Sequence, residues 1–187
     1  MQKEGLTILD LGVDAGGSYM RKDSASTVRV GADTRRNSLA RANRRYGIEV
    51  CLLDAQNPQG LPFRTGAFDG VEMYFPHVKL LYGLTAFHTP LWSELNRVVA
   101  SDGYVGVVFD VPPEGYRVAE AESFSTRVYQ PENVLWRNAV DNGFDVTLTK
   151  LDRDNLRALG TQFSNRIAGR LESEPDYSAY QLNVTIT

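Results

Sequence analysis

Hydrophobic residues along the chain follow two alternating patterns. Short runs of about six apolar and β-branched residues lie between glycine, proline and aspartate, which is typical of buried strands. These runs occupy residues 6–11, 27–32, 48–53, 70–75, 104–109, 144–149 and 180–186. Several of the segments between them have apolar residues at helical spacing. This spacing predicts helices over 35–46, 90–100 and 131–142, and one further helix with Leu156, Leu159, Phe163 and Ile167 on a single stripe.

The alternation of strands and helices predicts the architecture. Neighbouring parallel strands need a crossover between them, and a helix usually supplies it. We therefore expect a three-layer, doubly wound, Rossmann-like α/β fold around a seven-stranded, mainly parallel sheet. The 187 residues contain no internal repeat and no Pro/Ser-rich linker, so a single domain over 1–187 is expected.

Charge is unevenly distributed along the chain. The formal net charge of −3 provides no overall attraction to nucleic acid. Residues 21–45, however, contain eight Lys and Arg against two acids. Such a block is usually the solvated face of a helix, and contact with a polyanion is the alternative.

Cysteine content and hydropathy exclude some kinds of site and indicate where in the cell the protein is expected. Cys51 is the only cysteine, so an intrachain disulfide is impossible and a zinc site built from cysteines is excluded. No run approaches the roughly 18 apolar residues of a membrane span. Residues 1–5 lack the apolar region of a signal peptide, so we expect a cytoplasmic protein without membrane contact.

Three successive predicted strands end in an acid: Asp10, Asp33 and Asp54. In an open doubly wound sheet, ligands bind at the carboxyl ends of the strands, where the strand order reverses. Asp33 follows Gly12 by 21 residues, a spacing at which a carboxylate accepts both hydroxyls of a ribose. The alternative is that Asp33 caps the helix that begins near Arg35.

Five segments then occur in the order and spacing of a known family. They are 9–17 (LDLGVDAGG), 30–33 (VGAD), 53–71 (with LDAQ, LPF and AFDGV), 95–104 (LNRVVASDGY) and 142–146 (NGFDV). Together they resemble the class I S-adenosylmethionine-dependent methyltransferases, in the ubiquinone-biosynthesis-like (type 11) branch. The resemblance covers about residues 6–150, and the final strand at 180–186 fits the reversed last strand of that fold.

The resemblance implies S-adenosylmethionine as the cofactor and no metal. The residues that it places against the cofactor are Asp10, Gly12, Asp14, Gly16, Asp33, Thr34, Asp54, Ala55 and Tyr74. In the family, the acid at Asp33 holds the ribose, the acid at Asp54 meets the adenine amino group, and the next backbone amide faces the ring. Asp14 replaces the middle glycine of the family's loop. Its carboxylate would either crowd the cofactor or hold the cofactor's positive charge.

Methyl transfer depends mainly on positioning, with a base where the acceptor carries a proton. The catalytic candidates are His77 and Tyr74, at the end of the fourth predicted strand. A neutral imidazole at His77 can accept a proton; the alternative is a loop histidine bonded to backbone. His88 and Asp110 are further candidates near the acceptor.

We therefore expect a methyltransferase that acts on a small-molecule acceptor. One alternative is a tRNA or other RNA methyltransferase, with phosphate contacts from Arg35, Arg36, Arg41, Arg44 and Arg45. Another is a catalytically inactive, methyltransferase-like binding protein, favoured by Asp14 and by a first strand that starts near Leu6, which would leave a partner chain to close the site. A nicotinamide-binding Rossmann domain ranks last, because its glycine pattern fits at only two of three positions.

Overall fold

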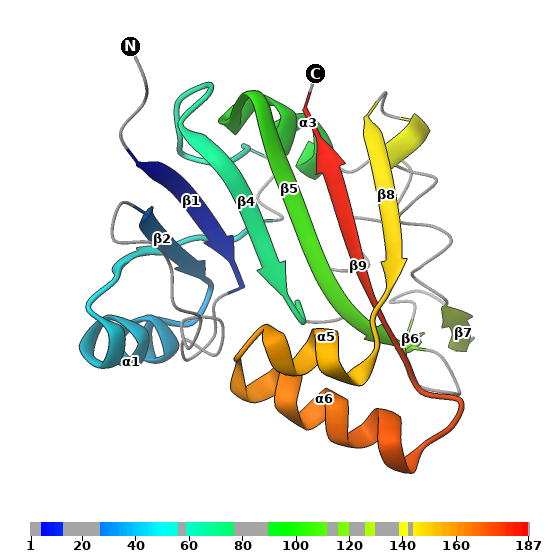
Figure 1. Cartoon of the computed structure of the whole chain (residues 1–187). Helices are drawn as coiled ribbons and strands as arrows, with labels where there is room; N and C mark the ends of the chain where they lie inside the picture. Colours follow the sequence, from blue (N-terminus) through cyan, green and yellow to red (C-terminus); the bar gives the residue numbers. More distant parts are fainter. Residues whose placement is uncertain are drawn as a thin grey trace.

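A computed structural model gives the architecture of the chain. It describes residues 5–12, 27–55, 59–76, 90–111, 116–119, 126–129, 139–141 and 144–186. The main sheet has seven strands in the order β3-β2-β1-β4-β5-β9-β8 (Figure 1). These strands are β1 (Leu6–Leu11), β2 (Thr27–Asp33), β3 (Glu49–Leu52), β4 (Phe68–Tyr74), β5 (Val99–Val111), β8 (Asp145–Lys150) and β9 (Ser178–Thr185).

The helices are α1 (Arg36–Tyr46), α3 (Pro90–Val98), α5 (Arg153–Ala158) and α6 (Gln162–Ser173). Two further strands, β6 (Tyr116–Ala119) and β7 (Thr126–Tyr129), form a separate antiparallel pair that the sequence pattern did not predict. Within the described part of the chain, no helix is long and apolar enough to cross a membrane.

Strand direction confirms the predicted topology. β1 to β5 pair in parallel, whereas β9 runs antiparallel to both β5 and β8. The chain moves outward from β1 through β2 to β3 and then returns to the other side of β1 as β4. The strand order therefore reverses between β1 and β4, which is where doubly wound sheets bind their ligands.

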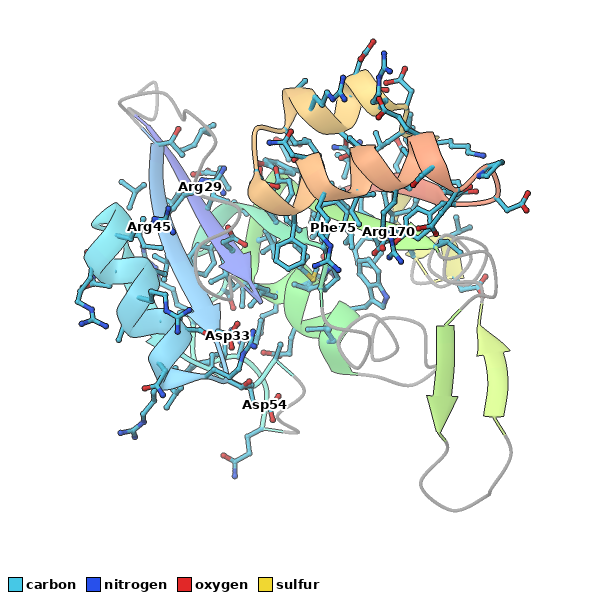
Figure 2. All side chains as sticks on the ribbon, turned by 90° about the horizontal axis from the view of Figure 1, so that it is seen from below. Arg29, Asp33, Arg45, Asp54, Phe75 and Arg170 are labelled. Atoms are coloured by element: carbon cyan, nitrogen blue, oxygen red, sulfur yellow. The ribbon has the colours of Figure 1, made fainter. Side chains whose placement is uncertain are left out.

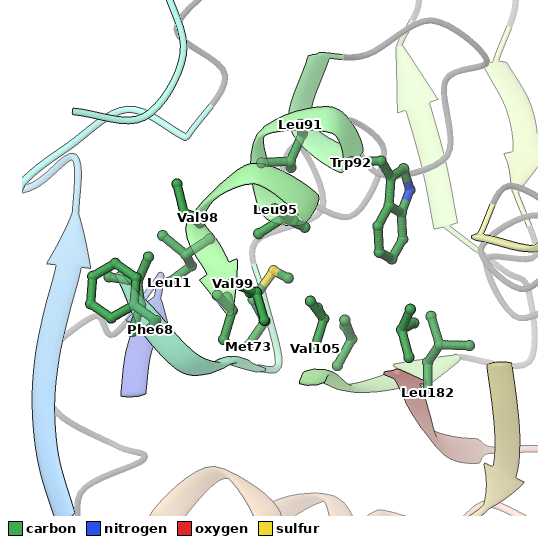
Figure 3. Packing of buried hydrophobic residues seen from close by; sticks show 14 of the residues in the cluster. Leu11, Phe68, Met73, Leu91, Trp92, Leu95, Val98, Val99, Val105 and Leu182 are labelled. Atoms are coloured by element: carbon green, nitrogen blue, oxygen red, sulfur yellow. The ribbon is translucent and has the colours of Figure 1, made fainter. Parts of the chain in front are cut away.

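Alternation along the central strands builds two hydrophobic layers. Val107 of β5 belongs to a core with Leu9 and Met73, and α3 covers this core with Leu91 and Leu95 (Figure 3). The next residue, Val108, belongs to a second core, whose helical members Leu156, Ile167 and Ala168 come from α5 and α6. Because successive strand residues face opposite sides, the sheet is the middle of three layers.

The helix predicted to carry Leu156, Leu159, Phe163 and Ile167 on one stripe is instead two helices. α5 ends at Ala158, and Gly160 adopts a φ of 69°, a left-handed conformation that ends a helix. Thr161 then caps α6. The break changes the helical phase, so Leu156 is buried while Phe163 is 42% exposed.

The other predicted helices agree more closely. α1 matches 35–46, with Leu39 and Ala42 buried and Gly47 directly after its end. The helix predicted at 90–100 ends at Val98, because Val99 already pairs with Phe68 of β4. Of the helix predicted at 131–142, only residues 139–141 are among those described, and they are helical.

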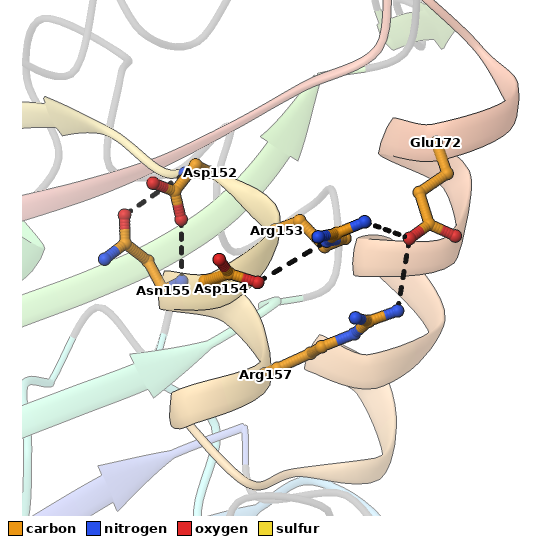
Figure 4. A network of polar contacts seen from close by, with 6 residues as sticks. All are labelled: Asp152, Arg153, Asp154, Asn155, Arg157 and Glu172. Atoms are coloured by element: carbon orange, nitrogen blue, oxygen red, sulfur yellow. Dashed lines mark hydrogen bonds and ion pairs between the residues drawn. The ribbon is translucent and has the colours of Figure 1, made fainter.

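Capping boxes and ion pairs hold the α5–α6 hairpin together (Figure 4). The Asp152 carboxylate accepts the Asn155 backbone N–H at 2.7 Å. The Thr161 hydroxyl oxygen accepts the Ser164 N–H at 2.9 Å, and both of these residues are buried. Glu172 of α6 accepts from Arg153 at 2.9 Å and from Arg157 at 3.2 Å. The exposed ion pairs contribute little each, so the buried cap is the stronger constraint.

Replacing Thr161 by alanine tests that cap. Thr161→Ala removes the acceptor of a buried N–H, and we expect a loss of about 1–2 kcal/mol in unfolding free energy by urea denaturation. Ser173→Ala, at the exposed end of the same helix, should change it by less than about 0.5 kcal/mol. An equal loss in both variants would contradict the assigned role of the cap.

Candidate functional site

The carboxyl ends of β1, β2 and β3 meet at one edge of the sheet. Gly12 turns the chain out of β1 with a φ of 75°, and its N–H donates to the Ala32 carbonyl oxygen at 2.8 Å. The turn therefore lies directly beside the end of β2. A residue without a side chain at this point allows a ligand to approach the backbone closely.

Asp33 ends β2 and is buried. Its Oδ1 accepts the Arg35 backbone N–H at 2.9 Å and the Arg35 Nε–H at 3.2 Å. The carboxylate thus shapes the start of α1, as the capping alternative proposed, although α1 has no conventional side-chain cap. This role is compatible with ligand binding, because a carboxylate has about four acceptor positions.

Asp54 follows β3 at the same edge. The Leu53 N–H donates to the Asp33 backbone oxygen at 3.0 Å, which places Asp54 one residue beyond the contact. Figure 2 shows Asp33 and Asp54 on the same side of the molecule, with the Asp54 side chain exposed. Thr34 is also exposed, and Ala55 is half-buried against the main core.

Asp10 lies deeper than the other two acids. It is 1% exposed and pairs in register with Gly31 of β2 and Glu72 of β4. The Arg29 Nη1 is 4.0 Å from the Asp10 Oδ2 and donates to the Glu72 Oε2 at 2.7 Å. Arg29 therefore holds the two carboxylates inside the sheet layer. A buried ion cluster of this kind depends on each member being paired.

Tyr104 completes this cluster from β5. Its hydroxyl donates to the Glu72 Oε1 at 2.7 Å. Burial, together with the Glu72 carboxylate, raises the pKa of the Tyr104 hydroxyl, which remains a donor at neutral pH. The sequence analysis did not assign roles to Arg29 and Glu72. The available signal was a charged residue inside each of two otherwise apolar strand runs, 27–32 and 70–75.

The end of β4 supplies two aromatic residues, Tyr74 and Phe75. Tyr74 and Gly12 each lie two residues beyond the register pair Asp10–Glu72. Tyr74 is half-buried against the second core. Phe75 adopts a φ of 49° and donates its N–H to the Val108 oxygen at 2.7 Å. Its ring stacks on Phe163 of α6 at 6.3 Å between centroids.

Asp110 lies near the end of the neighbouring strand β5. The Tyr177 hydroxyl donates to the Asp110 Oδ2, and the Arg170 Nη1 donates to the Tyr177 oxygen at 3.0 Å. The Arg170 guanidinium also covers the Tyr177 ring at 4.7 Å. Burial and the Asp110 carboxylate raise the pKa of the Tyr177 hydroxyl. Asp110 is therefore linked to α6 through Tyr177.

Other sequence-predicted candidates cannot be placed. Asp14, Gly16, His77 and His88 lie outside the described residues. Among the residues that are described, no group of three or more His, Cys, Asp and Glu could hold a metal ion.

A hollow of about 620 Å³ occurs elsewhere, at the corner between β8 and the α5–α6 hairpin. Its lining residues are Lys150, Leu151, Asp152, Arg153, Asp154, Leu171 and Glu172. None of the predicted site residues is among them.

Comparison with solved structures supports the fold assignment. No family model matches the sequence, and no curated protein matches it. Solved structures do match. A geranyl diphosphate methyltransferase in complex with SAM is 14% identical, with a TM-score of 0.66 over 98% of this chain and 79% of its own. The 16S rRNA methyltransferase KamB is 16% identical, with a TM-score of 0.68 over 97% and 87%.

The chain has the fold of the SAM-dependent methyltransferases. The [4+2]-cyclase SpnF shares it as well, at 17% identity and a TM-score of 0.62, over 98% of this chain and 76% of its own. At these identities the likeness to solved structures establishes only the fold. The chemistry has to be inferred from the residues of the site.

Replacing Arg29 tests the buried cluster. Arg29→Met removes the cation between Asp10 and Glu72, and we expect a loss of about 3–5 kcal/mol in unfolding free energy. The double variant Arg29→Met/Glu72→Gln should recover part of that loss. Arg41→Met, an exposed arginine on α1, is the control and should change stability by less than about 0.5 kcal/mol. If Arg29→Met is no worse than the control, the cluster does not stabilise the sheet.

Proposed function

We propose that the protein is an S-adenosylmethionine-dependent methyltransferase with a small-molecule acceptor. The observation that carries this proposal is that Gly12, Asp33 and Asp54 lie at the carboxyl ends of β1, β2 and β3, on the edge of the sheet that adjoins the reversal of strand order between β1 and β4. The shared fold supports it, since one of the matching structures is a methyltransferase in complex with SAM. The resemblance of the sequence motifs to the type 11 branch belongs to this proposal.

The residues at this edge fit the chemical groups of that cofactor. Asp33 accepts the two ribose hydroxyls, and Asp54 accepts from the adenine amino group. Thr34 and Ala55 flank these two acids. By the resemblance, Gly12 and two residues outside the described part of the chain, Asp14 and Gly16, contact the methionine part, and Asp10 belongs to the same motif.

When bound, the cofactor supplies a methyl group already activated on a sulfonium, so the protein mainly positions the acceptor. Tyr74, two residues beyond the last register pair of β1 and β4, contacts the acceptor from the end of β4. His77 follows three residues later and takes a proton from the acceptor where one is present. Asp110 contributes a carboxylate from β5, held in place by Tyr177.

RNA is the second candidate acceptor. Arg35, Arg36, Arg41, Arg44 and Arg45 are all exposed and follow one another from the end of β2 along α1. A matching structure is an rRNA methyltransferase. Anisotropy of a fluorescein-labelled RNA hairpin tests this candidate. Binding that weakens with salt and is reduced by Arg41→Glu would favour RNA over a small molecule.

Replacing Asp33 tests the cofactor site. Wild type should bind S-adenosylmethionine and S-adenosylhomocysteine in calorimetric titrations, and Asp33→Ala should weaken both by about 1–3 kcal/mol. Asp33→Asn is the sharper variant. Its amide oxygen still accepts the Arg35 N–H, so the stability of α1 is retained while acceptor capacity for a ribose is lost. Asp176→Ala, an exposed acid between α6 and β9, is the control.

Three outcomes would contradict the proposal. If Asp33→Ala lowers thermal stability but leaves binding unchanged, the carboxylate is a structural cap. If the wild-type protein binds neither cofactor form, the inactive binding protein becomes the better assignment. Binding of NAD in place of both would indicate a nicotinamide-binding domain.

A further inference from the structure

Four strands of the sheet contribute to a buried charged cluster made of Asp10, Arg29, Glu72 and Tyr104. Arg29 Nη1 donates to Glu72 Oε2 at 2.7 Å and lies 4.0 Å from Asp10 Oδ2, and the Tyr104 hydroxyl donates to the other Glu72 oxygen at 2.7 Å. The side chains of Asp10, Arg29 and Glu72 are 1%, 5% and 7% exposed. Two carboxylates and one guanidinium give these members a formal net charge of −1.

The sheet has a specific feature that admits this cluster. The Tyr104 ring lies across Gly70, where a Cβ would come within 2.5 Å of the ring Cε1. Because Gly70 and Glu72 are alternate residues on one face of β4, the missing side chain lets the Tyr104 hydroxyl reach the carboxylate. Apolar residues of similar volume often stabilise a protein as well as buried ions do or better, so the ions indicate a role besides stability.

The cluster lies close to the Gly12 turn. Asp10 precedes Gly12 by two residues, which places its backbone about 7 Å from the turn along the strand. Glu72 is the register partner of Asp10 on β4, and neighbouring strands are about 4.8 Å apart. The backbones of both acids are therefore within about 10 Å of the turn. Charges that are buried in a sheet are screened less by solvent and salt than charges on the surface.

The proposed cofactor loses a positive charge when it reacts. S-adenosylmethionine has a sulfonium in its methionine part, which Gly12 contacts by the resemblance. On transfer, the methyl group bonds to a lone pair of the acceptor, and the sulfur keeps the electron pair of the broken C–S bond. The product, S-adenosylhomocysteine, is therefore a neutral thioether with otherwise the same groups. A fixed negative charge near the turn attracts only the first of the two forms through the sulfur.

We propose that the charged cluster makes the site prefer S-adenosylmethionine to S-adenosylhomocysteine, and that Glu72 and Arg29 set this preference. The inference rests on the proposed function and deepens it, because it assigns residues that favour retention of the substrate form and release of the product form. Both residues act at a distance through their charge. Glu72 adds to the attraction for the sulfonium, whereas Arg29 lowers it and stabilises the two carboxylates.

Calorimetric titrations with both cofactor forms test the inference through the ratio of the two affinities. Wild type should bind S-adenosylmethionine more tightly than S-adenosylhomocysteine. Glu72→Gln has nearly the same shape but lacks one negative charge, so the ratio should fall by about tenfold, which corresponds to about 1.4 kcal/mol of Coulomb energy. Arg29→Met should raise the ratio by a similar factor, because the two carboxylates then lack the guanidinium.

Three further variants separate charge from structural damage. Arg29→Met/Glu72→Gln removes one charge of each sign and should return the ratio to that of wild type. Tyr104→Phe removes a hydrogen bond from the Glu72 carboxylate without changing the charge and should leave the ratio unchanged. Asp145→Asn is the matched control, since Asp145 is an exposed acid on β8, four strands from β1. A smaller folded fraction weakens both ligands by the same factor, so the ratio is the decisive measurement.

The outcomes distinguish this inference from the function on which it rests. If wild type binds neither cofactor form, the proposed function fails. If it binds both but prefers S-adenosylhomocysteine, or if Glu72→Gln and Arg29→Met do not shift the ratio in opposite directions, the inference is overturned and the proposed function stands. Should one of these two variants fail to fold, the other and the wild-type preference decide, since each has its own predicted sign.

Discussion

The pairing of β1 between β2 and β4 is the constraint on which the candidate site depends. Parallel pairing brings the carboxyl ends of neighbouring strands to one edge, and the return of the chain to β4 places the reversal beside Gly12. Asp33 and Asp54 reach that edge by following the same register outward. Residues far apart in sequence therefore lie at the same edge of the sheet.

The same pairing also buries charge. Asp10, Arg29 and Glu72 lie on adjacent strands in positions that face one layer, and the ion pair between Arg29 and Glu72 is almost fully enclosed. Burying ions is unfavourable unless each finds a partner. The cluster therefore ties β1, β2 and β4 to a single register, since a slip of one residue would turn every charged side chain to the opposite face.

The strands, and the acids at or near their carboxyl ends, were predictable because their signals are local. The apolar runs before Asp33 and Asp54 contain both the strand and its polar end, whereas Asp10 lies within β1 and is buried. The break at Gly160 was not predicted, because the apolar spacing from Leu156 to Ile167 continues across it. The Phe75–Phe163 contact was also missed, since it joins strand and helix segments far apart in sequence and depends on a backbone angle that no spacing pattern reveals.

The candidate site therefore has two halves, one with local signals in the sequence and one without them. The half at β1, β2 and β3 follows from the strand order alone. The half at β4, β5 and α6 depends on the α5–α6 hairpin, which is held by its own caps and by the second core. The same fold occurs in a geranyl diphosphate methyltransferase and in a [4+2]-cyclase, so the fold alone does not fix the reaction. Side chains of the half at β4, β5 and α6 can therefore change without altering the register that builds the first half.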